Sequence, residues 1–389
     1  MKKIAVVTAT RAEYGLLLPV IRALRDKENE GIRVDLIVTG THLSEQYGLT
    51  VMEIEESGVR IDYRIPISVD SSSELAISKN QAEVLVKFTR VFHDESYDAV
   101  VLLGDRYETM AIAIAAGNTR TPVFHLCGGD TTEGALDEWI RHSITKISYL
   151  HFVTNEISRK RVIQMGEAPE RVYNYGSTSI DNILSLANMS KLEALQSIGL
   201  NDCSYAVCTY HPVTTKMGGI EEQVGSFLDA LSHFPHIQFI ITKSNADLGG
   251  GKINQMLDDA EKSTDNLHVY CSLGVRRYLS LMKHSEFVIG NSSSGIIETP
   301  AFHIPTINIG DRQRGRLQTS SIINCGEDVG AITDAINKAT STSFRASCIC
   351  VNNPYGDGHA GIRIAEKCFE TVIEGSIDLK KKFYDLEIQ

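Results

Sequence analysis

Residues 287–298, FVIGNSSSGIIE, pass from an apolar run through a loop of small polar residues into a helical pattern. Unpaired backbone N–H groups, serine hydroxyls and the N-terminus of the following helix make such a loop suitable for a diphosphate. An apolar run followed by an amphipathic helix recurs along the chain, for example at 3–26 and at 205–233. This alternation predicts parallel sheets that are covered by helices on both faces.

The strand–helix alternation starts anew near residue 205, so we predict an α/β protein with two doubly wound, Rossmann-like domains around a central cleft. A length of 389 residues fits two or three domains. We expect the first domain at 1–170, the second at 171–364, and a tail at 365–389 that packs back on the first. The Ser/Thr-rich stretch 338–347 is expected to be a surface loop.

The charge balance excludes one large class of partner. There are 38 Lys and Arg residues against 49 Asp and Glu residues, so the net charge is −11, whereas nucleic-acid-binding proteins usually carry a basic surface. Apolar runs stay below the ~18 residues of a membrane span, and MKKIAVVTAT lacks a signal-peptide cleavage pattern. We therefore expect a cytoplasmic protein with no membrane partner. The eight cysteines form no CxxC pair, and we expect no metal and no cofactor.

Charged residues follow the predicted strands of the first domain, where ligands of such sheets bind. Arg11, in the segment ATRAEYG, can bind a phosphate through two hydrogen bonds. Asp105 and Arg106 follow the strand at 99–103, with capping of the next helix as the structural alternative for Asp105. The segments HLCGGD and DEWIRH add further candidates, for which a solvated helix face is the alternative at Asp137 and Arg141. These candidates are Cys127, Asp130, Asp137 and Arg141.

The strands of the second domain end in a similar way. His211 precedes a proline at the end of the strand 205–209, although a single histidine is more often structural. Glu298 is expected in the first turn of the helix after the GNSSSG loop, where its carboxylate can accept two hydrogen bonds from a ribose diol. The remaining candidates, which could contact a base, a sugar or a phosphate, are Asn245, Ser292, Ser293, Arg312, Arg314 and Arg316.

Taken in this order, GDRYE, DEWIRHSITK, HPVTT and GNSSSGIIE resemble the UDP-N-acetylglucosamine 2-epimerase family over nearly the whole chain. The resemblance is greatest to its hydrolysing branch, which serves sialic acid biosynthesis in bacteria. It implies a two-domain fold similar to GT-B glycosyltransferases. It also implies conversion of UDP-N-acetylglucosamine and water to N-acetylmannosamine and UDP, by elimination of UDP and hydration of a 2-acetamidoglucal.

The resemblance also implies roles for single residues. Asp105, Asp137 and His211 match catalytic positions of the family. Cys127 stands where the family commonly has Glu, and a thiol is a poor substitute for a carboxylate base. Either that Glu is dispensable in this subgroup, or Asp130 or Asp137 takes its role. The positions that hold UDP in the family correspond to Arg11, Arg106, His211, Asn245, Ser292, Ser293, Glu298 and Arg312.

Three other functions remain compatible with these motifs. The first is a hydrolysing 2-epimerase for UDP-2,4-diacetamido-2,4,6-trideoxyglucose, on the route to legionaminic acid. The second is a non-hydrolysing epimerase that returns UDP-N-acetylmannosamine. The third is a GT-B glycosyltransferase or a protein that only binds nucleotide sugars. In each case the partner is a small UDP-sugar, and the family tendency predicts a homodimer or homotetramer.

Overall fold

The computed structural model describes residues 1–45, 49–70, 73–131, 137–211, 219–243, 250–271, 273–314, 316–375 and 377–387. The chain divides into two compact units. Unit 1 consists of Met1–Asn182 and Gly358–Gln389, and unit 2 of Ile183–Asp357. Within the residue ranges given above, no helix has both the length and the apolar character needed to cross a membrane.

Unit 1 is built on a parallel sheet of seven strands in the order β3-β2-β1-β4-β5-β6-β7. The order reverses between β1 and β4, and the carboxyl ends of these strands are where doubly wound sheets bind ligands. The strands are β1 Lys2–Thr8, β2 Ile32–Thr39, β3 Tyr63–Ile65, β4 Ala99–Leu103, β5 Val123–Leu126, β6 Leu150–Val153 and β7 Val172–Asn174.

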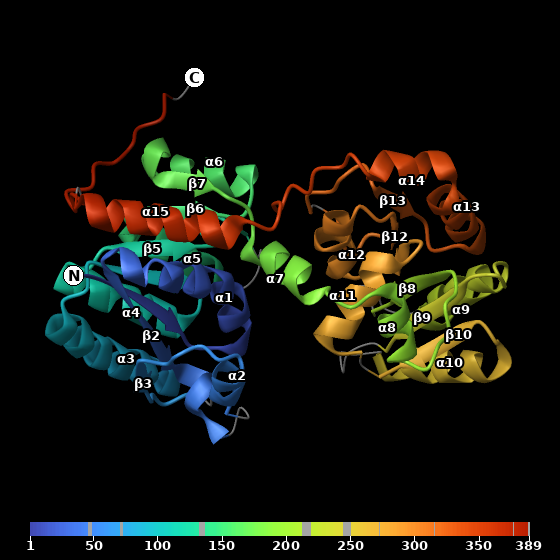
Figure 1. The fold of residues 1–389 in the computed structure, drawn as a ribbon, viewed down its shortest axis with the longest axis horizontal. Helices are drawn as coiled ribbons and strands as arrows, with labels where there is room; N and C mark the ends of the chain where they lie inside the picture. Colours follow the sequence, from blue (N-terminus) through green and yellow to red (C-terminus); the bar gives the residue numbers. More distant parts are fainter. Residues whose placement is uncertain are drawn as a thin grey trace. The chain divides into compact units, whose positions relative to one another are not determined.

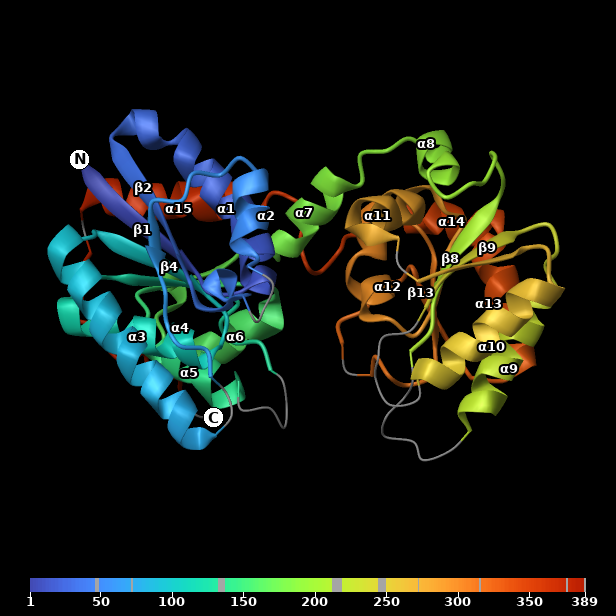
Figure 2. The same cartoon turned by 90° about the horizontal axis from the view of Figure 1, so that it is seen from below.

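Helices cover both faces of this sheet, as the near-continuous apolar strands require. The helices α3, α4 and α5 lie on one face, and α1 and α15 lie on the other (Figure 2). Their side chains join those of the strands in a buried apolar cluster on each face. The helices of unit 1 are α1 Arg11–Asp26, α2 Val51–Glu56, α3 Glu74–Glu95, α4 Tyr107–Thr119, α5 Asp137–Ile147, α6 Glu156–Gln164 and α15 Ala360–Glu374. The boundary at 182–183 lies within the helix α7 Thr178–Leu186. Short 3-10 turns are η1 Glu28–Glu30, η2 Gly40–Leu43 and η4 Pro169–Arg171.

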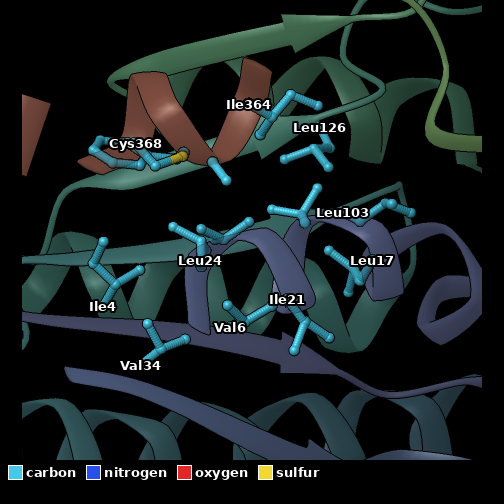
Figure 3. Close-up of a cluster of buried hydrophobic side chains, with 14 of the residues drawn as sticks. Ile4, Val6, Leu17, Ile21, Leu24, Val34, Leu103, Leu126, Ile364 and Cys368 are labelled. Atoms are coloured by element: carbon cyan, nitrogen blue, oxygen red, sulfur yellow. The ribbon is translucent and has the colours of Figure 1, made fainter. Parts of the chain in front are cut away.

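The helix α15 returns to unit 1 and lies beside α1 (Figure 1). Ile364 and Cys368 of α15 point into the same buried cluster as Leu17 and Leu24 of α1 (Figure 3). The two helices approach closely at Gly361, because a Cβ atom there would lie 2.5 Å from Cβ of Pro19 on α1. The most C-terminal helix therefore belongs to the core of unit 1.

Unit 2 repeats the architecture with a six-stranded parallel sheet in the order β10-β9-β8-β11-β12-β13. Its strands are β8 Tyr205–Thr209, β9 Gln238–Thr242, β10 Leu267–Tyr270, β11 Val288–Gly290, β12 Thr306–Ile309 and β13 Ile322–Cys325. Its helices are α8 Lys191–Gln196, α9 Ile220–Ser232, α10 Gly250–Ser263, α11 Gly274–His284, α12 Ser293–Ile297, α13 Val329–Thr340 and α14 Thr342–Cys348, with the 3-10 turn η5 Thr299–Phe302. The switch point lies between β8 and β11.

The predicted α/β fold with two doubly wound sheets is confirmed. The unit boundaries of the structure, however, lie at 182–183 and 357–358 rather than at 170 and 364. The first boundary is later because β7 pairs with β6 of unit 1. The second is earlier because the backbone N–H of Gly361 donates to Asp181 of unit 1 at 2.7 Å.

The prediction of a surface loop at 338–347 is wrong. These residues form the end of α13 and most of α14, and the side chain of Ser341 caps the N-terminus of α14.

The close approach of α15 and α1 predicts that unit 1 is sensitive to a methyl group at Gly361. We expect Gly361→Ala to lower the free energy of unfolding by about 1–3 kcal/mol, as overpacking does in well-packed cores. Urea unfolding followed by the fluorescence of the single tryptophan, Trp139 on α5, measures this.

Gly117→Ala on α4 is the matched control, because the nearest atom to its added Cβ lies 3.9 Å away. Alanine in place of a helical glycine should be neutral or stabilising, by about 0.5–1 kcal/mol. Equal stabilities of the two variants would contradict the packing argument.

Candidate functional site

Polar residues gather where β1, β4 and β5 of unit 1 end. Asp105 follows β4, but it does not cap α4: the N-cap of that helix is Arg106. Instead, the Asp105 carboxylate accepts a hydrogen bond from the guanidinium of Arg141 on α5. Arg141 is only 5% exposed, so it is not part of a solvated helix face. The alternatives of a helix cap and of a solvated face therefore fail for these two residues.

The guanidinium of Arg141 contacts two further groups. One terminal nitrogen donates to the backbone carbonyl of Asp130 at 2.6 Å and to Glu138 at 3.4 Å. A buried cation is strongly destabilising unless its charge and its donors are satisfied. Arg141 thus joins the end of β4 to the segment after β5, and fixes the direction of the Asp105 carboxylate.

A hydrogen bond from His125 on β5 holds the loop that carries Asp105. Burial lowers the pKa of His125 to about 3, so its ring is neutral. Nε2 lies 2.9 Å from the carbonyl oxygen of Gly104, to which it donates in the neutral tautomer that this contact requires. Gly104 has a φ of +87°, a conformation that glycine adopts without strain.

Cys127 and Asp130 lie beside the Asp105–Arg141 pair. Burial raises the pKa of the Cys127 thiol well above its usual range, and the charges of Asp130 and Asp105 add to this shift. The thiol is therefore neutral and cannot act as a base. Oδ1 of Asp130 accepts hydrogen bonds from Thr154 at 2.9 Å and from Ser158 at 2.5 Å, so this carboxylate anchors the segment after β5 to β6 and α6.

A second acidic cluster, which the sequence analysis did not assign, lies at the switch point of unit 1. Glu108 is 1% exposed and accepts from Nε of Arg106 at 2.8 Å. Glu13 accepts from the backbone N–H groups of Ala9 at 2.8 Å and Thr10 at 3.1 Å. Within the part of the chain that the structure describes, Oε1 of Glu13 and Oε2 of Glu108 are buried without a hydrogen-bond partner. Burial, together with the charge of Glu108, raises the pKa of Glu13 to about 7.

In unit 2, the GNSSSG loop follows β11 at the switch point. Gly290 has a φ of +143°, and a Cβ atom there would lie 1.9 Å from the carbonyl oxygen of Thr209 on β8, so only glycine fits. The helix after the loop, α12, has five residues, and its dipole is correspondingly smaller than the predicted helix would supply. The hydroxyl of Ser292 caps it by accepting the N–H of Ser294 at 3.4 Å.

Glu298 is the C-cap of α12 rather than a residue of its first turn, because the helix begins at Ser293, within the GNSSSG loop, and ends at Ile297. Its carboxylate accepts a hydrogen bond from the hydroxyl of Ser294, which in turn accepts from the hydroxyl of Tyr278 at 3.3 Å. Burial raises the pKa of Glu298. This carboxylate is thus held in one direction by a side chain of the loop.

His211 and Arg312 follow β8 and β12, the two neighbours of β11 in the sheet. The guanidinium of Arg312 donates to the carbonyl oxygen of Asn291 at 3.0 Å. The backbone N–H of His211 donates to the side chain of Asn291 at 2.8 Å. A cation, serine hydroxyls and a fixed carboxylate therefore lie at the carboxyl edge of this sheet, an arrangement that suits a phosphorylated ligand with hydroxyl groups.

The family model described as UDP-N-acetylglucosamine 2-epimerase matches residues 24–368. The chain belongs to this family. It is 38% identical over 388 residues to GDP/UDP-N,N'-diacetylbacillosamine 2-epimerase (hydrolyzing) of Campylobacter jejuni, covering 99% of each chain. It is also 38% identical to polysialic acid biosynthesis protein P7 of Escherichia coli, covering 99% of this chain and 98% of that protein.

Solved structures of the family share the fold. The crystal structure of UDP-GlcNAc 2-epimerase from Neisseria meningitidis bound to UDP-GlcNAc aligns with a TM-score of 0.81, over 95% of this chain and 100% of that chain, at 20% identity. The identity is low, so this likeness bears on the fold alone. It agrees with the two-domain arrangement that the motifs predicted for a member of the UDP-N-acetylglucosamine 2-epimerase family.

The predicted site residues of this family member fall into two groups. At the carboxyl end of the sheet in unit 1, the structure places Asp105, Arg106, Cys127, Asp130 and Arg141. The side chains of Arg11 and Asp137, and all of Asn245, lie outside the described parts of the chain. At the corresponding end of the sheet in unit 2 are His211, Ser292, Ser293, Glu298 and Arg312.

Several residues that contact the predicted site residues in the structure were given no role in the sequence-based prediction. One signal was present, because Thr10 and Glu13 have the spacing of a capping box, which the structure contains. Nothing in the sequence distinguishes the buried Glu108 in the first turn of α4 from the exposed Glu74 in the first turn of α3. The unassigned residues are Glu13, Glu108, His125, Tyr278, Asn291 and Gln313.

The buried carboxyl of Glu13 predicts a specific pH dependence of stability. Since the pKa rises from 4.5 to about 7 on folding, the folded protein keeps a proton that the unfolded chain releases above pH 4.5. The free energy of unfolding should therefore fall as the pH rises from 4.5 to 7, by roughly 2–3 kcal/mol from this group. Glu13→Gln keeps an oxygen for the two backbone N–H groups and should lack this decrease.

Urea unfolding at pH 5 and pH 7.5, followed by Trp139 fluorescence, measures the difference between the two proteins. Glu74→Gln is the control, because Glu74 is an exposed residue in the first turn of α3 and its neutralisation disturbs no buried cluster. Parallel losses of stability in wild type and Glu13→Gln would contradict the prediction.

Proposed function

We propose that this protein is a hydrolysing 2-epimerase that converts UDP-N-acetylglucosamine and water to N-acetylmannosamine and UDP, in a route to sialic acid. The observation that carries the proposal is the 38% identity, over 99% of both chains, to a relative named as a hydrolysing 2-epimerase. The equally similar relative from E. coli is named for polysialic acid biosynthesis, which supports the sugar that we propose.

The proposed reaction has two steps. In the first, a carboxylate removes the proton at C2, the electron pair forms a double bond between C1 and C2, and the C1–O bond to UDP breaks. In the second, water adds across the double bond of the 2-acetamidoglucal: its hydroxyl goes to C1, and C2 receives a proton on the opposite face. This inverts C2 and releases N-acetylmannosamine. Carboxylates that exchange protons with carbon contribute about 10²–10⁴-fold in rate.

Asp105 and Asp137 are our candidates for the acid and the base, and His211 for the third catalytic residue. Arg141 supports the role of Asp105, because its hydrogen bond holds the carboxylate in one direction. The neutral thiol of Cys127 leaves the proton transfers to these carboxylates. Asp130 is a less suitable candidate, since two hydroxyl groups already donate to one of its oxygens.

We assign the binding of UDP to predicted site residues of both groups described above. Arg312 and Arg106 would stabilise the negative charge that develops on the diphosphate, as fixed charges do in water-excluded sites. Ser292 and Ser293 would donate to phosphate oxygens, and Glu298 would accept from the ribose hydroxyls. Arg11 and Asn245 complete the proposed set. The cytoplasm is the expected location, and a homodimer or homotetramer the expected assembly, which sedimentation measurements would test.

A second substrate has specific support. The Campylobacter relative is named for a diacetylbacillosamine substrate, so UDP-2,4-diacetamido-2,4,6-trideoxyglucose is the alternative. The two sugars differ at C4 and C6. Both would react at C1 and C2 through the same steps.

Product analysis by proton NMR decides between these reactions. With UDP-N-acetylglucosamine we expect free UDP and N-acetylmannosamine, and with the diacetamido analogue a lower kcat/KM. The reverse preference would favour the alternative substrate. A UDP-sugar as the only product would exclude hydrolysis, and turnover that requires an acceptor sugar would favour a glycosyltransferase.

The role of Asp105 predicts the behaviour of Asp105→Asn. Exchange of the C2 proton with deuterated water should fall about 10²-fold or more, with little change in UDP affinity. NMR measures the exchange, and thermal unfolding shows whether the variant remains folded, since Arg141 loses its charged partner.

Asp98→Asn is the matched control, because Asp98 precedes the same strand at its opposite end and accepts from the backbone N–H of Lys3 at 2.8 Å. Proton exchange retained in Asp105→Asn would contradict the assignment of Asp105.

A further inference from the structure

We propose that Asn291 is a positioning residue, which sets where His211 and Arg312 stand at the end of the sheet in unit 2. The proposal rests on the proposed function, because it names a residue that arranges the UDP-binding and catalytic groups. Asn291 itself is 1% exposed, and its polar groups form hydrogen bonds with other residues of unit 2. It would therefore act through the two residues it holds.

The side-chain amide of Asn291 pairs with both backbone groups of His211. Oδ1 accepts from the N–H of His211 at 2.8 Å, and Nδ2 donates to the carbonyl oxygen of His211 at 2.8 Å. The orientation of the amide follows from this pairing, because a backbone N–H can only donate and a carbonyl can only accept. The pair therefore fixes the backbone of His211 directly after β8.

The backbone of Asn291 joins the other two strand ends. Its N–H donates to the carbonyl oxygen of Thr209 on β8 at 3.2 Å. Its carbonyl oxygen accepts from Arg312 at 3.0 Å and from Nε2 of Gln313 at 2.8 Å. One residue thus connects the ends of β8, β11 and β12, which carry the loops with His211, the serines and Arg312.

The contacts explain why asparagine stands at this position. Gly290 brings β11 so close to β8 that a Cβ atom would overlap the carbonyl oxygen of Thr209. The following side chain must therefore bridge a short distance, and must offer one donor and one acceptor. Aspartate has the same shape but offers no donor when ionised, so it would place a charged oxygen against the carbonyl oxygen of His211.

The test compares Asn291→Asp with Asn266→Asp. Asn266 is also buried, and Nδ2 of its amide donates to the carbonyl oxygens of Phe234 at 3.1 Å and Ile237 at 2.9 Å. It directly precedes β10, at the opposite end of the same sheet. Both changes place a carboxylate against backbone carbonyls in unit 2, so a general loss of stability should appear in both variants. UDP affinity, measured by calorimetry on the full chain, separates them.

We expect Asn291→Asp to bind UDP about tenfold more weakly or worse, while Asn266→Asp binds it as wild type does at a similar loss in Tm. A protonated carboxyl offers one donor and one acceptor, as the amide does. Burial should raise the pKa of the introduced carboxyl, so lowering the pH from 8 to 5.5 should restore UDP affinity relative to wild type at the same pH. Protonation also relieves a general loss of stability, so Asn266→Asp is measured at both pH values, and its UDP affinity relative to wild type should be unchanged at each.

Asn291→Ala covers the case in which Asn291→Asp does not fold, and it should lose UDP affinity at every pH. Wild-type affinity in either Asn291 variant, or an equal loss in Asn266→Asp, would overturn the proposal. Arg312→Ala separates this failure from a failure of the proposed function. If wild type binds UDP and Arg312→Ala does not, the proposed UDP site stands whatever the Asn291 variants show; if wild type binds no UDP, the proposed function itself fails.

Discussion

Arg141 is a buried cation, and the arrangement of polar groups in unit 1 depends on its need for partners. A guanidinium that is 5% exposed requires a nearby carboxylate and acceptors for its N–H groups, because an unpaired buried charge costs several kcal/mol. Asp105, Glu138 and the backbone of Asp130 meet this requirement. The direction of the proposed catalytic carboxylate is thus a consequence of charge compensation. His125 adds a neutral contact from the neighbouring strand.

Around β11, the strand ends of unit 2 are joined mostly by hydrogen bonds of neutral groups. The amides of Asn291 and Gln313 and the hydroxyls of Ser294 and Tyr278 make the connections, and Glu298 is the carboxylate among them. Burying neutral polar groups that are hydrogen-bonded costs far less than burying charges. The two sheets reverse their strand order in the same way, but the contacts described at the two sites differ: ion pairs after β4 in unit 1, and amide and hydroxyl contacts after β11 in unit 2.

The sequence predicts the central strands of both sheets well, but it misses most of the strands at the sheet edges. Strands such as β1, β4 and β8 are apolar runs bounded by polar turns, which is the signal of a buried parallel strand. The short strands β3, β7 and β13 were not predicted, because three or four residues at or near a sheet edge carry little periodicity. The motifs located Asp105 and Arg312. Their partners, such as Arg141 for Asp105, come from distant segments, and burial is a property of the folded chain that no local pattern encodes.

The return of α15 to unit 1 has a consequence for the newly made chain. The strand β1 and helix α1 emerge from the ribosome early, while α15, which covers their apolar side, follows only after all of unit 2. At about 5–20 residues per second, this side stays uncovered for roughly tens of seconds. Unit 2 is continuous in sequence, so it can complete its core before unit 1 does. During translation, the apolar side of β1 and α1 is therefore a surface open to aggregation until α15 has been made.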